Sequence, residues 1–129
     1  MSRRTLLPAA LLAAALLAGP AAQAHHSEVA EYDLDKPVKV TGTLSRVEWL
    51  NPHVWFYVDV ADGKGKATTW GFSTAPPGAL MRRGVFKDTL KIGEVVTVEG
   101  ARARDGSNNA SAHRVTAVDG RNLLEPPGG

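Results

Sequence analysis

Three histidines have the positions that a metal site at a free N-terminus requires. His25 and His26 are adjacent, and His53 follows a proline further along the chain. If the chain is cleaved after Ala24, His25 becomes the first residue and carries a free α-amine beside its imidazole. Such a terminal histidine chelates a metal through the amine and Nδ1, and copper stands at the top of the affinity order for nitrogen ligands of this kind. These residues predict a copper site made of His25, His26 and His53.

Each histidine also has a simpler interpretation. His25 and His26 also fit a solvated polar arm that binds nothing. His53 stands at the start of a predicted strand, where a hydrogen bond to a loop carbonyl would explain it without a metal. His113 lies in the middle of the fifth predicted strand with no evident partner in the sequence, so we expect it to be structural or exposed.

Two aromatic side chains on the second predicted strand point away from the predicted core. Trp55 and Tyr57 alternate with the apolar residues Val54, Phe56 and Val58. Aromatic rings on an OB-type barrel bind flexible chains by stacking on bases or sugars. The alternative is that the N-terminal arm or a helix covers both rings. We name Trp55 and Tyr57 as candidate ligand-binding residues.

No pattern in the sequence supports catalysis. The chain contains no cysteine, and its serines lack the histidine and acid context that activates a nucleophile. Acidic residues gather between positions 28 and 35, where a solvated segment explains them. No glycine-rich phosphate loop is present. We therefore expect a protein that is not an enzyme.

The first 24 residues have the three parts of a cleavable export signal. Arg3 and Arg4 form a positive start, residues 6–18 are apolar apart from one proline, and Ala22-Gln23-Ala24 has the pattern that signal peptidase reads. The apolar run is shorter than the ~20 residues of a membrane-spanning helix. We expect a periplasmic or secreted protein without membrane insertion, exported by the general secretory or the twin-arginine route.

The net charge of the exported chain restricts the partners that it can bind. The chain has 15 Lys and Arg against 13 Asp and Glu. Two of the arginines, Arg3 and Arg4, lie in the signal, so the exported chain is formally neutral. A neutral chain lacks the basic field that attracts nucleic acid or anionic lipid. The expected partner is therefore a small ligand, a glycan or a protein of the cell envelope.

Three segments follow the signal. Residues 25–37 are polar with little periodicity and are predicted to form an N-terminal arm. Residues 38–124 contain short alternating runs separated by turn signals, as β-strands do, and are long enough for one hydrophobic core. Residues 125–129 consist of glutamate, proline and glycine and predict a flexible tail.

The order of elements predicts an OB-like barrel. Alternation predicts strands near 38–49, with a bulge at Ser45-Arg46, and near 53–60, 68–72, 95–104 and 110–118. A last short strand is expected through Leu124, and a short capped helix at 78–83 that ends at Gly84. Three strands, one helix and two further strands are the order of an OB barrel. The prediction is all-β, a five- to six-stranded barrel with one helix between strands 3 and 4; a small β-sandwich is the alternative.

Short motifs spread over the mature chain form a joint pattern. They are His25-His26-Ser27, Glu31-Tyr32-Asp33, Lys36-Pro37-Val38, Gly42-Thr43, Val47-Glu48-Trp49, Asn51-Pro52-His53, Trp70-Gly71-Phe72, Leu80-Met81-Arg82-Arg83-Gly84, Val98-Glu99-Gly100 and Asp105-Gly106-Ser107. The pattern resembles a family of small exported bacterial proteins known only as a domain of unknown function and thought to be OB-like. The resemblance implies export and a barrel, and it implies no activity.

Two functions follow from these observations. The first is an exported, non-enzymatic module that binds a ligand or partner in the cell envelope, with Trp55 and Tyr57 on its binding surface. The second is a periplasmic copper-binding protein that uses His25, His26 and His53. A purely structural subunit of an envelope complex is a third alternative.

Overall fold

The computed structural model describes residues 28–126. The signal at 1–24, the histidines His25 and His26 and the last residues of the tail lie outside the described residues, so those predictions stay predictions. A helical turn at 28–31 comes first. It is followed by β1 (Tyr32–Glu48), β2 (Trp55–Ala61), β3 (Ala67–Ser73), α2 (Pro77–Arg82), β4 (Val95–Ala103) and β5 (Asn109–Ala117).

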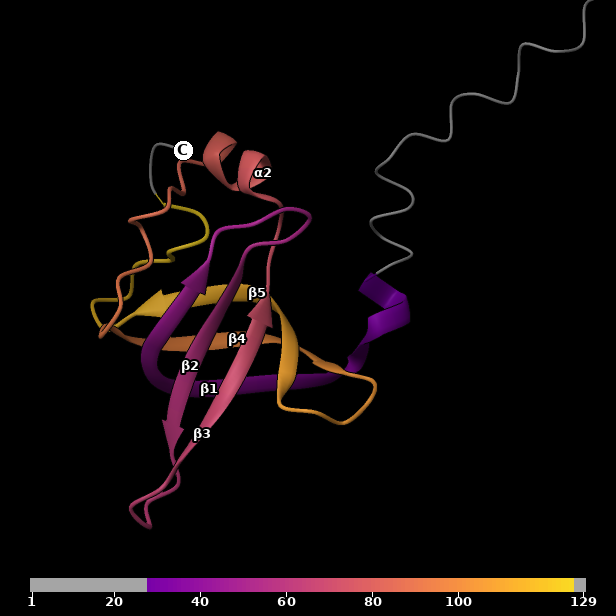
Figure 1. Cartoon of the computed structure of the whole chain (residues 1–129), viewed down its shortest axis with the longest axis vertical. Helices are drawn as coiled ribbons and strands as arrows, with labels where there is room; N and C mark the ends of the chain where they lie inside the picture. The colour runs from indigo at the N-terminus through magenta and orange to yellow at the C-terminus, as the bar shows by residue number, and fades with distance from the viewer. Residues whose placement is uncertain (1–27, 127–129) are drawn as a thin grey trace, which may run out of the picture.

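The five strands form a closed barrel in the order β1-β2-β3-β5-β4. Neighbouring strands are antiparallel except β3 and β5, which run parallel over three paired positions. Figure 1 shows α2 above one end of the barrel and the turn of the β2–β3 hairpin at the opposite end. The prediction of an all-β OB-like barrel with one helix between strands 3 and 4 is confirmed, with five strands.

The core consists of the side chains that alternate inward along the strands. Val54, Phe56 and Val58 are fully buried, as their alternation with polar and aromatic neighbours predicts. Phe56 stacks on Phe72 of β3, with their ring centroids 5.3 Å apart. Burial of these apolar side chains drives closure of the barrel.

The first strand begins earlier than the sequence suggested. Its bulge lies between Leu44 and Arg46, as predicted. However, β1 starts at Tyr32, so half of the expected arm at 25–37 belongs to the barrel. The strand is interrupted by a register shift between Asp33 and Pro37, and Leu34 is exposed. The alternation that reveals a strand is therefore absent where this strand starts.

Two smaller expectations are corrected at the ends of elements. Residues 121–124 form no strand; a single bridge joins Thr116 to Asn122, and Leu123 and Leu124 are buried against the core. The helix α2 has no side-chain cap, because a proline occupies the capping position. Its predicted end is confirmed, since Gly84 has the positive φ of 82° that glycine tolerates best.

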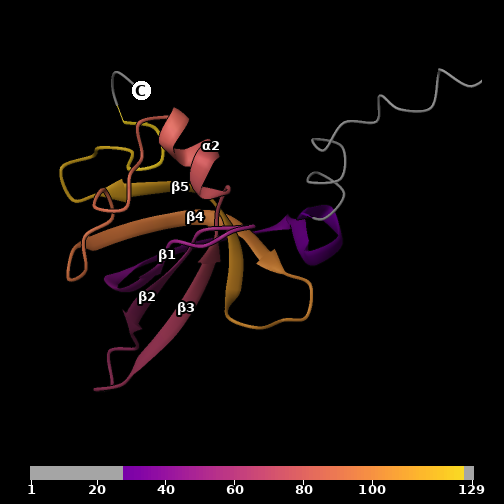
Figure 2. The same cartoon turned by 45° about the horizontal axis from the view of Figure 1, so that its top comes forward.

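A glycine, Gly100, lets β4 and β5 approach each other closely. A Cβ atom on Gly100 would lie only 1.9 Å from the carbonyl oxygen of Ser111, so any larger residue would push the two strands apart. Gly100 also follows a register shift in the β4–β5 pairing. Figure 2 shows β4 and β5 side by side, with the N-terminal turn standing near the start of β1.

Candidate ligand-binding cleft

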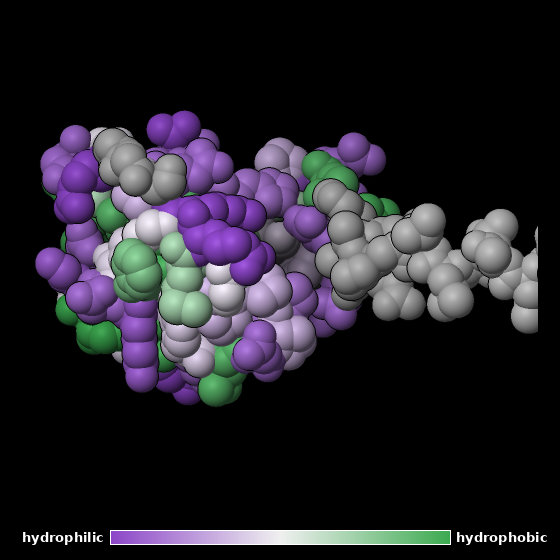
Figure 3. Space-filling model, turned by 90° about the horizontal axis from the view of Figure 1, so that it is seen from above, coloured by the Kyte–Doolittle hydropathy of each residue, from purple (hydrophilic) through white to green (hydrophobic). Residues whose placement is uncertain are grey.

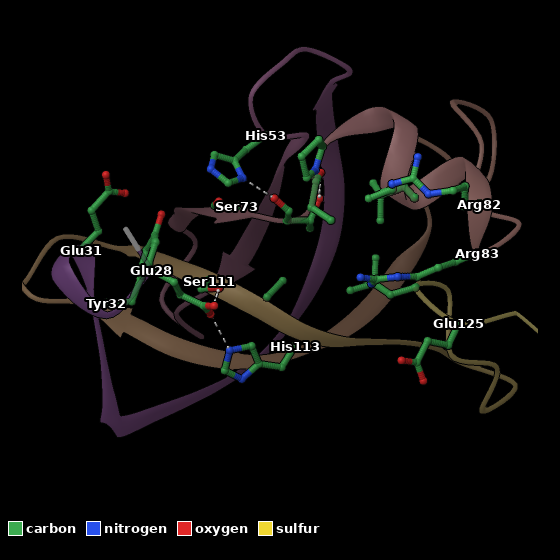
Figure 4. A pocket seen from close by; sticks show the side chains of 17 residues that line it. Glu28, Glu31, Tyr32, His53, Ser73, Arg82, Arg83, Ser111, His113 and Glu125 are labelled. Carbon is green, nitrogen blue, oxygen red and sulfur yellow. Dashed lines mark hydrogen bonds and ion pairs between the residues drawn. The ribbon is translucent and has the colours of Figure 1, made fainter. Parts of the chain in front are cut away.

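A cleft of about 780 Å³ lies between the N-terminal turn, the start of β2, α2 and β5. It begins where β3 and β5 part. The last paired residues of these parallel strands are Ser73 and Ser111, and both line the cleft. Beyond them β3 leads toward α2 while β5 runs on to His113. Figure 4 shows that the side chains of these two segments face the same space.

The carboxylate of Glu28 fastens the N-terminal turn to β5. Its Oε1 accepts a hydrogen bond from the Ser111 hydroxyl at 2.8 Å and lies 3.1 Å from Nε2 of His113. Arg104 supports the same turn, because its Nε donates to the Val29 carbonyl at 2.8 Å and its backbone N–H donates to the Glu31 carbonyl at 2.9 Å. The turn thereby forms one wall of the cleft.

His53 forms the loop hydrogen bond that the simpler interpretation predicted. Its Nδ1 lies 2.8 Å from the Thr74 carbonyl oxygen, and because a carbonyl only accepts, Nδ1 carries the hydrogen. The neutral ring then presents the lone pair of Nε2 to a ligand or a metal, an arrangement common among metal-binding histidines. Figure 4 shows His53 on the side of the cleft opposite His113.

The sequence did not assign His113 to the site. It lies on β5, and its Nε2 faces the Glu28 carboxylate, so the neutral ring keeps the lone pair on Nδ1. The only available signal was the alternation of Ser111 and His113 along one face of the strand. That signal does not reveal Glu28, which lies more than eighty positions earlier in the chain.

Two glutamates occupy one end of the cleft, and two arginines occupy the other end together with Glu125 (Figure 4). Glu28 and Glu31 come from the N-terminal turn, whereas Arg82 and Arg83 come from the end of α2 and the residue after it. Figure 4 shows both arginine side chains extending from the helix toward the cleft. The face of the molecule seen from above, where α2 lies in Figure 1, has strongly hydrophilic residues beside paler surface (Figure 3).

Tyr32 lines the cleft as a neutral hydroxyl. Burial raises the pKa of Tyr32, and a hydrogen bond with the Ser73 side chain only partly offsets this shift. The phenol therefore stays protonated at neutral pH and can donate or accept a hydrogen bond. Tyr32 also lines a second hollow of about 400 Å³ beside Trp55 and the β4–β5 loop.

Trp55 and Tyr57 lie on the outer face of the barrel, outside the cleft. Both are half-buried and stack on each other with ring centroids 6.4 Å apart. The Arg46 guanidinium covers Tyr57 at 4.0 Å from the ring centre, and the Tyr57 hydroxyl donates to Glu48 at 3.2 Å. Of the two rings, only Trp55 lines the second hollow.

The described residues alone do not form a metal centre. Among positions 28–126, no group of three or more His, Cys, Asp or Glu side chains can hold a metal ion. Of the three predicted copper ligands, only His53 is described. No helix in the same part of the chain is long and apolar enough to cross a membrane.

Comparison with known proteins supports the fold and the family. The model of a family of unknown function, DUF6152, matches residues 13–113. No curated protein matches the chain. Among solved structures, the mitochondrial single-stranded DNA-binding protein Rim1 of S. cerevisiae is similar, with a TM-score of 0.51 and 8% identity over 68% of this chain and 95% of that chain. At this identity the likeness establishes the fold alone.

The partial exposure of the Trp55 and Tyr57 rings predicts how much stability the protein loses when either ring is removed. We expect Trp55→Ala and Tyr57→Ala each to lower the free energy of unfolding by about 1–2 kcal/mol, since both rings are half-buried, whereas Phe56→Ala should cost about 3–5 kcal/mol. Urea denaturation measures all three. A loss for Trp55→Ala as large as that for Phe56→Ala would make the tryptophan a core residue and remove it as a candidate ligand contact.

Proposed function

The chain belongs to DUF6152, a family of unknown function, and we propose that it is an exported, non-enzymatic module of the cell envelope that binds a small ligand in the cleft. The observation that carries this proposal is the convergence of ionisable side chains from four separate elements on one cleft. Its volume of about 780 Å³ lies within the range of small-molecule sites, about 300–1,000 Å³. Export rests on the signal pattern of residues 1–24.

The contacts of the two serines in the cleft favour binding over catalysis. The Ser111 hydroxyl donates to Glu28, and the Ser73 side chain forms a hydrogen bond with Tyr32. Neither serine is hydrogen-bonded to the imidazole of His53 or His113, the two histidines within the described residues, that would act as its base. The mixed charge of the cleft also favours a small ligand over nucleic acid, which requires a basic surface.

Filling the cleft should abolish ligand retention. Ala79 lies on α2 and lines the cleft, so Ala79→Trp should block it. Ala67, at the exposed start of β3, does not line the cleft, and Ala67→Trp is the matched control. Native mass spectrometry of protein isolated from the periplasm should detect a bound small molecule on the wild type and the control, and none on Ala79→Trp.

Two results would contradict the proposal. One is a wild-type protein that carries no small molecule. The other is equal retention by the wild type and Ala79→Trp, in a variant whose circular dichroism spectrum shows an intact barrel. The native mass spectra also test export, because the mass of the mature protein should correspond to a chain that begins at His25.

A second candidate function, copper binding, is favoured by the position of Glu28. His26 precedes Glu28 by two residues in the sequence. Glu28 itself contacts His113 in the cleft. The same cleft contains His53 with a free lone pair on Nε2. We propose that copper would bind the α-amine and imidazole of His25, with His26 and His53 completing a nitrogen-rich site.

Copper binding should depend on a native N-terminus. Adding one alanine before His25 keeps every side chain but moves the α-amine away from the imidazole, so copper affinity should fall at least about tenfold. His53→Ala should also weaken binding if the N-terminal residues reach the cleft. Titration calorimetry on the native, extended and His53→Ala proteins measures both effects. Equal affinity in the native and extended proteins would contradict the terminal copper site.

A further inference from the structure

We infer that the ligand of the cleft is a small zwitterion, with an ammonium group at one end and a carboxylate at the other, as in a short peptide. The inference rests on the proposed binding function and names the class of ligand. It is drawn from the separation of charge along the cleft, from the bonding state of the charged side chains, and from the apolar wall between them.

The end formed by the N-terminal turn is suited to a cation. Glu31 is exposed, lines the cleft and makes no side-chain hydrogen bond or ion pair with a described residue. Glu28 beside it is held in place by Ser111 and His113. The exposed carboxylate of Glu31 can therefore accept hydrogen bonds from an ammonium group. Figure 4 shows both glutamates at the same end of the cleft.

The opposite end is suited to a carboxylate. Arg82 and Arg83 line the cleft, and neither side chain forms a hydrogen bond or an ion pair with a described residue. The Arg82 guanidinium lies near Gly78, with Nη1 3.6 Å from the point where a Cβ atom added to that glycine would lie. Guanidinium groups bind carboxylates through two parallel hydrogen bonds. Glu125 also lines this end, but no ion pair joins it to either arginine.

The wall between the two ends combines apolar contact with hydrogen-bonding groups. The partly exposed Ala79 supplies apolar surface, which suits small aliphatic side chains, and the almost fully buried Leu80 and Leu124 also line this wall. His53 offers the lone pair of Nε2, and Tyr32 supplies a neutral hydroxyl. Peptide N–H and C=O groups require such partners when they leave water. A short peptide with small side chains matches each part of the wall.

A ligand with a single charge fits this arrangement less well. A simple anion drawn to Arg82 and Arg83 would extend toward two carboxylates, and a simple cation at Glu31 would extend toward two guanidinium groups. Repulsion between like charges costs binding energy, whereas complementary potentials favour one orientation. A zwitterion gains at both ends, and its orientation is fixed with the amine toward the N-terminal turn.

The test uses three forms of one peptide on the mature protein. Trialanine carries both charges, N-acetyl-trialanine lacks the ammonium group, and trialanine amide lacks the carboxylate. Titration calorimetry in the presence of EDTA excludes a contribution from metal-bound peptide. We expect trialanine to bind at least about tenfold more tightly than either capped form.

Matched variants assign each charge to its end. The double substitution Arg82→Gln/Arg83→Gln should weaken trialanine at least about tenfold and leave trialanine amide unchanged. Glu31→Gln should weaken trialanine and leave N-acetyl-trialanine unchanged. Arg114→Gln, on β5 and outside the cleft, is the control and should bind like the wild type. These variants change exposed side chains, so folding should be retained.

Several outcomes would overturn the inference. It fails if the wild type binds none of the peptides, if the capped forms bind as tightly as trialanine, or if Arg114→Gln weakens binding as much as the cleft variants. The binding function is tested separately by native mass spectrometry. A small molecule retained by the wild type and lost in Ala79→Trp, but lacking an amine or a carboxylate, would contradict the zwitterion and leave the binding function standing.

Discussion

The carboxylate of Glu28 is the contact on which the candidate site depends. It receives hydrogen bonds from Ser111 and His113 and so joins the first described residue to the last strand. This contact and the two hydrogen bonds from Arg104 hold the N-terminal turn in place as one wall of the cleft. Hydrogen bonds to a charged acceptor are stronger than neutral ones, which suits a contact between segments so distant in sequence.

The barrel determines where the cleft can form. Its two parallel strands pair at only three positions, ending at Ser73 and Ser111. The chain then leaves β3 for α2, because Pro76 and Pro77 cannot continue a hydrogen-bonded strand. The opening is thus a consequence of the topology, and the side chains at its edge decide what it binds. Gly100 does not line the cleft but supports its edge, since only glycine allows β4 to lie so close to Ser111.

Local patterns in the sequence predicted the barrel but not the cleft. The alternation around Phe56 and the turn at Gly84 identify β2 and the end of α2, because these signals depend on neighbouring residues. The start of β1 at Tyr32 was missed, since its register shift hides the alternation. The loop hydrogen bond of His53 was predicted and is confirmed, and the structure also places His53 on the cleft. The partnership of Glu28 with His113 depends on tertiary contact, which spacing alone does not reveal.

Amide hydrogen exchange at Arg104 tests the central claim most directly. Its backbone N–H donates to the Glu31 carbonyl and so reports whether the N-terminal turn is docked. If Glu28 holds the turn against β5, Glu28→Ala should speed exchange of this amide at least about tenfold, as expected for a locally opening segment. Glu31→Ala should leave the rate unchanged, since the Glu31 side chain makes no hydrogen bond or ion pair with a described residue. An Arg104 amide that exchanges at the wild-type rate in Glu28→Ala would contradict the claim.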